Sequence, residues 1–243
     1  MYDRAAAVIC AAGSSSRMGG IKKEFQILKK VSAETGVHVT VLGSSVRAFA
    51  SVPSIETIVI AVPEDGESAA RGAVSAFLDF PRPKILFVKG GESRRASVFN
   101  ALSALSPFDP SIVLIHDGAR PWVTPSLIEK IIEEVKIHGA VIPALMLTDT
   151  PKECDAPLPE FPSQEKPRTV FIKRHLKRAD TVIAQTPQGF RFREILEAHE
   201  KAAVQDGEFT DDAEVWGRFC GSVAVIPGSP ENRKITFPED IEQ

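Results

Sequence analysis

The sequence predicts an α/β fold, with a Rossmann-like, mostly parallel twisted sheet and flanking helices. Short runs of small or β-branched residues recur along the chain, at residues 5–12, 55–62, 84–88, 112–115 and 139–147. Segments with helical spacing of apolar residues separate most of these runs, and strands that alternate with helices pair in parallel. The run at residues 55–62 is β-branched and continuous, which indicates a strand covered on both faces.

Residues 148–180 differ in composition from the rest of the chain. Prolines interrupt this segment at positions 151, 157, 159, 162 and 167, with charged residues between them. Because proline lacks a backbone donor and breaks helices, the segment cannot form a compact helical unit. A loop of this length inside one domain is uncommon unless it has a function. A surface loop without a role is the alternative.

The remaining elements follow from helical spacing, caps and breakers. We expect helices at residues 41–52, 67–78, 93–105, 125–138, 193–204 and 211–220, and a last strand at residues 221–227. Prolines follow the first two helices and end them. Ser93 or Glu92 would cap the third helix. Asp211 and Asp212 would cap the last helix or lie beside a metal ion, and capping is the preferred interpretation.

The composition is typical of a soluble globular protein with one substantial core. The chain has 243 residues, of which 43% are hydrophobic and 25% charged, so we expect a single domain over residues 1–243. A net charge of -3 gives no general attraction to nucleic acid or to an anionic membrane. The three cysteines lack the C-x-x-C pairing of zinc sites. Without a signal peptide or a long apolar run, the sequence predicts a cytoplasmic protein.

The first apolar run leads into a loop that suits a phosphate group. Gly13 and the three serines after it carry little bulk, so backbone N–H groups can approach an anion. Arg17, Lys22 and Lys23 follow closely and supply positive charge. The Walker and G-x-G-x-x-G patterns are both absent, which disfavours a P-loop enzyme and a plain Rossmann dehydrogenase. The loop therefore favours a polyphosphate ligand, and a tight turn with solvated basic side chains is the alternative.

Two later strands also end in residues that suit ligand binding. Gly90 and Gly91 follow one strand, and His116 and Asp117 follow another. Ligands of open α/β sheets bind at the carboxyl ends of the strands. A carboxylate at such a position can hold the Mg²⁺ that triphosphate transfer needs, so Asp117 is the metal candidate. His116 is expected to be a hydrogen-bonded, buried imidazole rather than a general base.

Sequence blocks in a fixed order carry a family resemblance. The stretch AAGSSSRMGG, with the lysine at position 23, resembles the opening motif of nucleotidyltransferases that activate sugar or polyol phosphates. The further blocks GGESRRASV, HDGARP, AQTPQGF, FTDDA and NRKIT follow in order over nearly the whole chain. Together they resemble the 2-C-methyl-D-erythritol 4-phosphate cytidylyltransferase family.

The resemblance implies a chemical activity and an assembly. The activity is Mg²⁺-dependent transfer of a cytidylyl group from CTP to 2-C-methyl-D-erythritol 4-phosphate, a step of non-mevalonate isoprenoid precursor synthesis. The assembly is a homodimer in which a protruding arm, formed by the proline-rich segment, embraces the partner subunit and brings residues to its site. Residues 1–243 would then form a single nucleotidyltransferase domain, with the arm at about residues 148–180.

The resemblance also implies roles for individual residues. Those that would contact CTP are Ala11, Ala12, Gly13, Ser14, Gly91, Glu92, Arg94 and Ser97, and those that would bind the acceptor are Asp117, Arg120, Thr150, Thr186 and Thr210. The catalytic cations would be Arg17, Lys23, Arg178 and Lys234, the first two for the transition state and the last two for positioning the acceptor phosphate. Arg174 is the alternative to Arg178, because two ways of counting the motif favour different residues.

The sequence departs from the family pattern in three places. Glu92 and Gly118 stand where family members often carry aspartate and alanine, and residues 26–40 are longer and more polar than the pattern. Other functions stay open. Ribitol-5-phosphate cytidylyltransferases share the same blocks, and a non-catalytic nucleotide-binding regulatory protein could keep the fold. A guanylyl- or uridylyltransferase would be expected to lack AQTPQGF and the arm.

Overall fold

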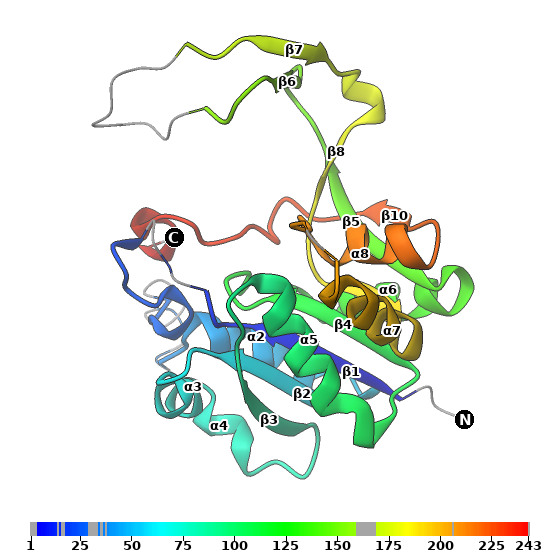
Figure 1. The fold of residues 1–243 in the computed structure, drawn as a ribbon. Coiled ribbons are helices and arrows are strands. Elements are labelled where there is room, and N and C mark those ends of the chain that lie inside the picture. The colour runs from blue at the N-terminus through cyan, green and yellow to red at the C-terminus, as the bar shows by residue number, and fades with distance from the viewer. Residues whose placement is uncertain are drawn as a thin grey trace.

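The computed structural model describes residues 4–13, 15, 18–28, 34, 36, 38–158, 169–205 and 207–242. The strands of its main sheet are β1 (Ala5–Cys10), β2 (Ile55–Val62), β3 (Lys84–Lys89), β4 (Ile112–Asp117), β5 (Ala140–Met146), β8 (Val182–Ala184), β9 (Gln188–Arg191) and β10 (Ala224–Pro227). Their order is β10-β5-β9-β4-β1-β2-β3, and β8 pairs with β5 (Figure 1). The pairs among β1, β2, β3 and β4 are parallel, as is β5 with β10, whereas β8 and β9 run antiparallel. The predicted mostly parallel sheet is confirmed.

Helices cover both faces of this sheet. They are α2 (Val41–Ala50), α3 (Glu67–Ala73), α4 (Ser75–Leu78), α5 (Arg94–Leu105), α6 (Pro125–His138), α7 (Phe192–Ala203) and α8 (Asp212–Phe219), with short 3-10 turns η2 (Lys23–Phe25), η3 (Ser106–Phe108), η4 (Arg178–Asp180) and η5 (Pro238–Glu242). In β1, Ala7 and Ile9 pack in the core with α2 and α6, whereas Ala6 and Val8 pack in the core with α5 and α7. Successive strand residues point to opposite faces, which is why β1, buried on both faces, is apolar along its whole length.

Local sequence explains where the helices begin and end. The Thr124 Oγ1 accepts a hydrogen bond from the Leu127 N–H at 3.3 Å, and Pro125 occupies the first turn of α6. Gly139, at φ 82°, ends this helix one residue after His138, as predicted. The predicted helix at 67–78 is wrong in one respect, since it breaks at Val74 into α3 and α4.

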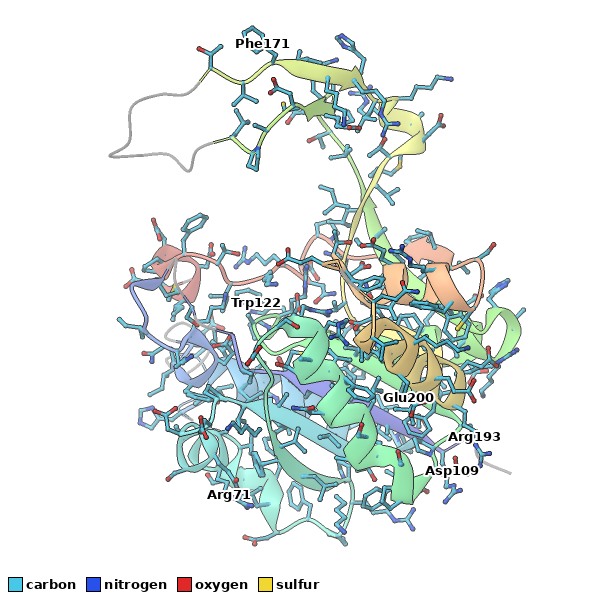
Figure 2. All side chains as sticks on the ribbon, in the orientation of Figure 1. Arg71, Asp109, Trp122, Phe171, Arg193 and Glu200 are labelled. Carbon is cyan, nitrogen blue, oxygen red and sulfur yellow. The ribbon has the colours of Figure 1, made fainter. Side chains whose placement is uncertain are left out.

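The proline-rich segment leaves the body of the molecule. Its strands β6 (Lys152–Cys154) and β7 (Ile172–His175) pair antiparallel and stand off from the main sheet (Figure 1). Phe171 lies far from the sheet on this projection (Figure 2). The projection from residue 148 to residue 180 is called the arm below; residues 159–168 of it lie outside the described part.

None of the helices in the described part of the chain has the length and apolar character needed to cross a bilayer.

Gly189 lets α6 pack directly on β9. A Cβ at this position would overlap the Cγ2 of Ile131 and would lie 2.8 Å from the Cγ2 of Val135. We therefore expect Gly189→Ala to lower the free energy of unfolding by about 1–3 kcal/mol, the usual cost of overpacking, in urea titrations. Gly217 is the matched control, because it is exposed inside α8 with no other atom near its missing Cβ. Gly217→Ala should raise the free energy of unfolding by about 0.5–1 kcal/mol, and equal effects of the two changes would contradict this packing account.

Candidate active site

A cavity of about 560 Å³ lies at the carboxyl ends of β1 and β4. Its walls come from the loop after β1, η2, the start of α5 and the segment before η5, which are far apart in the sequence. The residues predicted from the sequence that line it are Ala12, Gly13, Lys23, Gly91, Glu92, Arg94, Ser97, Asp117 and Lys234. Lys22, expected near the phosphate loop, and Ser93, expected only as a cap, also line it, whereas the lining residues Glu24 and Thr236 were missed by the sequence prediction. The carboxyl ends of the strands thus form the site, as expected for an open α/β sheet.

The loop after β1 and η2 form a positively charged wall. The Lys22 Nζ donates a hydrogen bond to the Gly13 carbonyl at 2.8 Å, which holds the two ends of the loop together. Lys23 lines the cavity from η2 and is largely buried. The Ser15 hydroxyl donates to the Glu24 Oε2 at 3.4 Å, and burial raises the pKa of this carboxyl. The predicted residues Ser14 and Arg17 lie outside the described part of the chain.

The opposite wall is the N-terminus of α5. The Gly91 N–H donates to the Ser97 hydroxyl at 3.0 Å, and this hydroxyl donates to the Ser93 carbonyl at 2.9 Å. The Ser93 hydroxyl caps the helix by accepting from the Ala96 N–H at 3.1 Å. A Cβ on Gly91 would overlap the Cβ of Ala96, so the turn can close this tightly only with glycine. Ser93, rather than Glu92, is therefore the cap, and Ser97 shapes the turn.

Asp117 is the centre of charge in the cavity. Its Oδ2 lies 2.9 Å from the Lys234 Nζ and 3.4 Å from the Arg120 Nε, and its Oδ1 lies 3.8 Å from the Arg94 Nε. Burial alone would raise the pKa of this carboxyl, but Lys234, Arg94 and Arg120 together hold the pKa well below its usual range. The carboxylate is therefore ionised at neutral pH and joins cations from three parts of the chain.

A buried amide network brings Lys234 to this carboxylate. The Gln185 Nε2 donates to the carbonyls of Ser229 and Asn232, and the Asn232 Nδ2 donates to the Thr186 carbonyl at 2.7 Å. The Ile235 N–H bonds to the Ala119 carbonyl at 2.8 Å. These bonds fix the NRKIT block against the AQTPQGF and HDGARP blocks. The three blocks thus form one structural unit at the cavity.

His116 is a buried structural imidazole and not a general base. It is fully buried, with its Nδ1 3.0 Å from the Thr186 Oγ1 and its Nε2 3.1 Å from the Arg120 carbonyl. Because a carbonyl can only accept, we assign the proton to Nε2, and Thr186 then donates to Nδ1. The same Thr186 hydroxyl accepts from the Asp117 N–H at 3.0 Å. Thr186 thus holds the Asp117 backbone through this hydrogen bond and does not line the cavity.

The burial of His116 predicts a pH dependence of stability. Burial lowers the pKa of this imidazole to about 4 from its ordinary 6.5, so the unfolded chain binds the proton more readily than the folded protein. The free energy of unfolding should therefore fall as the pH drops from about 6.5 to 4, by an amount on the order of 3 kcal/mol. Urea unfolding at several pH values measures it. In a His116→Gln variant this part of the slope should vanish, and a slope unchanged from that of the wild type would refute the assignment.

Several predicted residues lie away from the cavity. Ala11 is fully buried. The N–H and hydroxyl of Thr210 both donate to the Glu214 carboxylate at the start of α8. Thr150 and Arg178 lie on the arm, where the Arg178 Nη1 donates to the Thr148 carbonyl at 2.8 Å. Arg120 supports the site through its 2.8 Å bond to the Asn232 carbonyl without lining the cavity.

The structure separates the roles of the two adjacent aspartates, Asp211 and Asp212, which the sequence left open. Asp211 caps α8, since its Oδ1 accepts from the Glu214 N–H at 2.9 Å, whereas Asp212 is buried with its Oδ2 2.7 Å from the Arg94 Nη1. The block FTDDA was a signal for this region, but only the folded chain separates the two aspartates.

Cys10 lines the cavity at the end of β1. Burial raises the pKa of its thiol to about 12, so this residue is not a thiolate nucleophile.

The donor set fits an ion that arrives with the substrate. No three histidine, cysteine or acidic side chains gather as a self-sufficient metal site within the described ranges. Asp117, however, is an ionised carboxylate that lines the cavity beside the charged wall. Mg²⁺ is commonly held by one or two carboxylates and the phosphates of a nucleotide. Asp117 is thus a suitable protein ligand for an Mg²⁺–triphosphate complex.

A family model and curated relatives match nearly the whole chain. The family model described as IspD: 2-C-methyl-D-erythritol 4-phosphate cytidylyltransferase matches residues 5–243. A protein of that description from Pelotomaculum thermopropionicum is 35% identical over 240 residues, which cover 98% of this chain and 92% of the relative. The bifunctional enzyme IspD/IspF of Bartonella henselae is 37% identical over 238 residues, which cover 97% of this chain and 54% of the relative. The chain thus spans about half the length of several curated relatives that it matches.

Solved structures show the same fold. The 4-diphosphocytidyl-2C-methyl-D-erythritol synthase of Anaerococcus prevotii superimposes with a TM-score of 0.77 at 26% identity, covering 99% of this chain and 96% of that one. The 2-C-methyl-D-erythritol 4-phosphate cytidylyltransferase of Thermus thermophilus superimposes with a TM-score of 0.69 at 28% identity, covering 98% and 95%. The agreement extends over nearly the full length of both chains.

Proposed function

Because the chain belongs to the 2-C-methyl-D-erythritol 4-phosphate cytidylyltransferase family, we propose that it transfers a cytidylyl group from CTP to 2-C-methyl-D-erythritol 4-phosphate. A phosphate oxygen of the acceptor attacks the α-phosphorus of CTP, and the bond from that phosphorus to the oxygen bridging to the β-phosphate breaks. The products are 4-diphosphocytidyl-2-C-methyl-D-erythritol and pyrophosphate. The observation that supports this reaction most directly is the convergence of Lys23, Arg94, Asp117 and Lys234 on one cavity.

The charges in the cavity meet the main demand of this reaction. Two anions must be held together, and charge that develops on the α-phosphate oxygens must be stabilised. Lys23, on the wall formed by the loop after β1, would stabilise that charge, together with Arg17. Lys234 would orient the acceptor phosphate, because its ammonium is already fixed beside Asp117. The attacking oxygen is an anion, so no side chain has to remove a proton. The neutral His116 and Cys10 are consistent with this mechanism.

Mg²⁺ is part of the proposal. Asp117 would hold the ion together with phosphate oxygens of CTP, and the bound ion would supply positive charge to neutralise the triphosphate. Lys234 and Arg120 keep the Asp117 carboxylate ionised and in place for this role. The hydrogen bond from the Asp117 N–H to the Thr186 hydroxyl fixes the backbone of Asp117 as well.

A homodimer would complete the acceptor site. Leu158, Phe171 and Ile172 on the arm are 72%, 65% and 53% exposed, which is unusual for large apolar side chains without a partner. A second copy of the chain would cover them, and its arm would bring Thr150 and Arg178 to the neighbouring cavity. Mixing inactive Lys23→Ala and Arg178→Ala variants tests this, since mixed dimers keep one intact site and should regain turnover. Failure to regain any turnover after exchange of subunits would contradict the shared site.

The reaction itself is tested by a product assay. The protein is incubated with CTP and Mg²⁺ together with either 2-C-methyl-D-erythritol 4-phosphate or D-ribitol 5-phosphate, and pyrophosphate and the nucleotide product are measured. We expect turnover with the methylerythritol acceptor and little with ribitol phosphate. Turnover with ribitol phosphate alone would indicate the sister activity. Binding of CTP without turnover of either acceptor would indicate a regulatory protein.

A further inference from the structure

Arg94 reaches the cavity between two carboxylates. Its Nη1 lies 2.7 Å from the Asp212 Oδ2, and its Nε lies 3.8 Å from the Asp117 Oδ1. Asp212 is 1% exposed at the start of α8, and its Oδ1 lies 3.2 Å from the Nε2 of His199, which is fully buried in α7. The helices α5, α7 and α8 thus meet in a chain of polar groups that runs from the core, through Arg94, to the cavity.

Stability alone is a poor explanation for this buried pair. Removing Arg94 and Asp212 from water costs much of the attraction that they gain, and apolar side chains of similar size often pack equally well. Beyond its two polar partners, Asp212 adjoins the core, to which Val215 and Trp216 of the same helix belong. Burial would raise the pKa of Asp212, but Arg94 foremost, and then His199, lower it, so the carboxylate stays charged. A charge kept in such a place indicates a role in orienting its partner.

The partner has another carboxylate within reach. Asp117 lies close to the Arg94 Nε and is already paired with Lys234 and Arg120. Without Asp212, the guanidinium would be drawn to Asp117, which is the other carboxylate that contacts it in the described part of the chain. Arg94 would then turn from its present orientation in the cavity wall and would compete for the carboxylate proposed to hold Mg²⁺. Asp212 therefore separates the two functional groups by holding one of them.

We propose that Asp212 is a positioning residue that holds the Arg94 guanidinium towards the phosphates of CTP, and that His199 in turn positions Asp212. This inference rests on the proposed cytidylyl transfer and adds two residues outside the cavity to it. Arg94 is the group that would touch the nucleotide, and Asp212 and His199 act only through it. Because Arg94 contacts the bound nucleotide before the reaction, its misplacement should raise KM for CTP more than it lowers kcat.

Steady-state kinetics of four forms of the protein test this proposal, namely wild type, Asp212→Asn, Arg94→Met and the double variant. We expect Asp212→Asn to raise KM for CTP about 10-fold or more, on the scale of misplaced binding groups. If Asp212 acts through Arg94, KM for CTP in the double variant should be no higher than in Arg94→Met. The double variant should also melt at a higher temperature than Arg94→Met, because the latter keeps the buried charge of Asp212 without Arg94 to pair with it. Penalties that multiply in the double variant would overturn the proposal, as would an unchanged KM in folded Asp212→Asn.

Matched variants separate positioning from general damage. Asp211→Asn removes one negative charge from the adjacent residue and keeps a good helix cap, so its KM should equal that of the wild type. Should Asp212→Asn fail to fold, His199→Leu and His199→Gln carry the test. The glutamine keeps an N–H donor near Asp212, so KM for CTP should stay close to that of the wild type. The leucine has no donor and should raise KM. Equal KM values for these two variants and the wild type would overturn the proposal.

The outcome also separates this proposal from the reaction itself. Wild-type protein that turns over CTP with neither polyol phosphate would refute the proposed function. The same variants would then be compared by their dissociation constants for CTP with Mg²⁺, measured by calorimetry. A dissociation constant that rises in Asp212→Asn but not in Asp211→Asn would still support the positioning role, and equal constants would refute it.

Discussion

Asp117→Asn is expected to lower kcat about 10²–10³-fold, the scale of losing a group that organises charge in the transition state. The amide keeps the size of the side chain but removes the negative charge that Lys234 and Arg120 contact. The three cations around it would then repel one another, and Lys234 would lose its anchor. Initial rates of pyrophosphate release at saturating CTP and acceptor measure the effect.

A surface carboxylate provides the control for this variant. Asp109 forms a 2.6 Å ion pair with Arg193, and both residues are labelled in Figure 2. Asp109→Asn should leave kcat within about twofold of the wild type, because Asp109 does not line the cavity. A rate for Asp117→Asn as high as that of Asp109→Asn would mean that the carboxylate is not part of the machinery.

Lys23→Ala is expected to lower kcat by about 10²-fold or more, because it removes one of the cations that would stabilise the α-phosphoryl group in the transition state. Lys23 lines the cavity from the short turn η2 and is 8% exposed, so water cannot easily take its place. The rate of pyrophosphate release under saturating conditions is the measurement.

An exposed lysine provides the control here. Lys130 lies on the solvent side of α6, so Lys130→Ala removes the same charge far from the cavity and should leave kcat unchanged. Near-normal turnover of Lys23→Ala, in protein that binds CTP normally, would remove this lysine from the mechanism. A loss of CTP binding with an unchanged kcat would instead assign it to ground-state binding.

The buried framework of the fold could be predicted from sequence because its signals are local. The strand at 55–62 and the helix at 125–138 coincide with β2 and α6, since continuous β-branched runs, a capping threonine and a glycine stop each act within a few residues. The strands β8 and β9 were not predicted. They are three and four residues long, and only their pairing with β5 and β4 makes them strands.

The candidate site shows the same division. Glycines and charged residues after apolar runs predicted Gly91, Asp117 and Lys23, because every parallel strand ends at one edge of the sheet. The roles of Thr186 and Asp212 were not predictable. A threonine within AQTPQGF and one of two adjacent aspartates offer no local sign of the backbone or the guanidinium that they meet. Those partners lie far away in the sequence.

The structure of this protein crystallised with CTP and Mg²⁺ would test the central claim most directly, which is that distant cations converge on one triphosphate. We predict that the triphosphate lies in the cavity beside Asp117, with phosphate oxygens within hydrogen-bond distance of the Lys23 Nζ and the Arg94 guanidinium. A triphosphate bound elsewhere, such as in the hollow lined by Trp122 and Arg233, with Lys23 and Lys234 making no contact to it, would contradict the account.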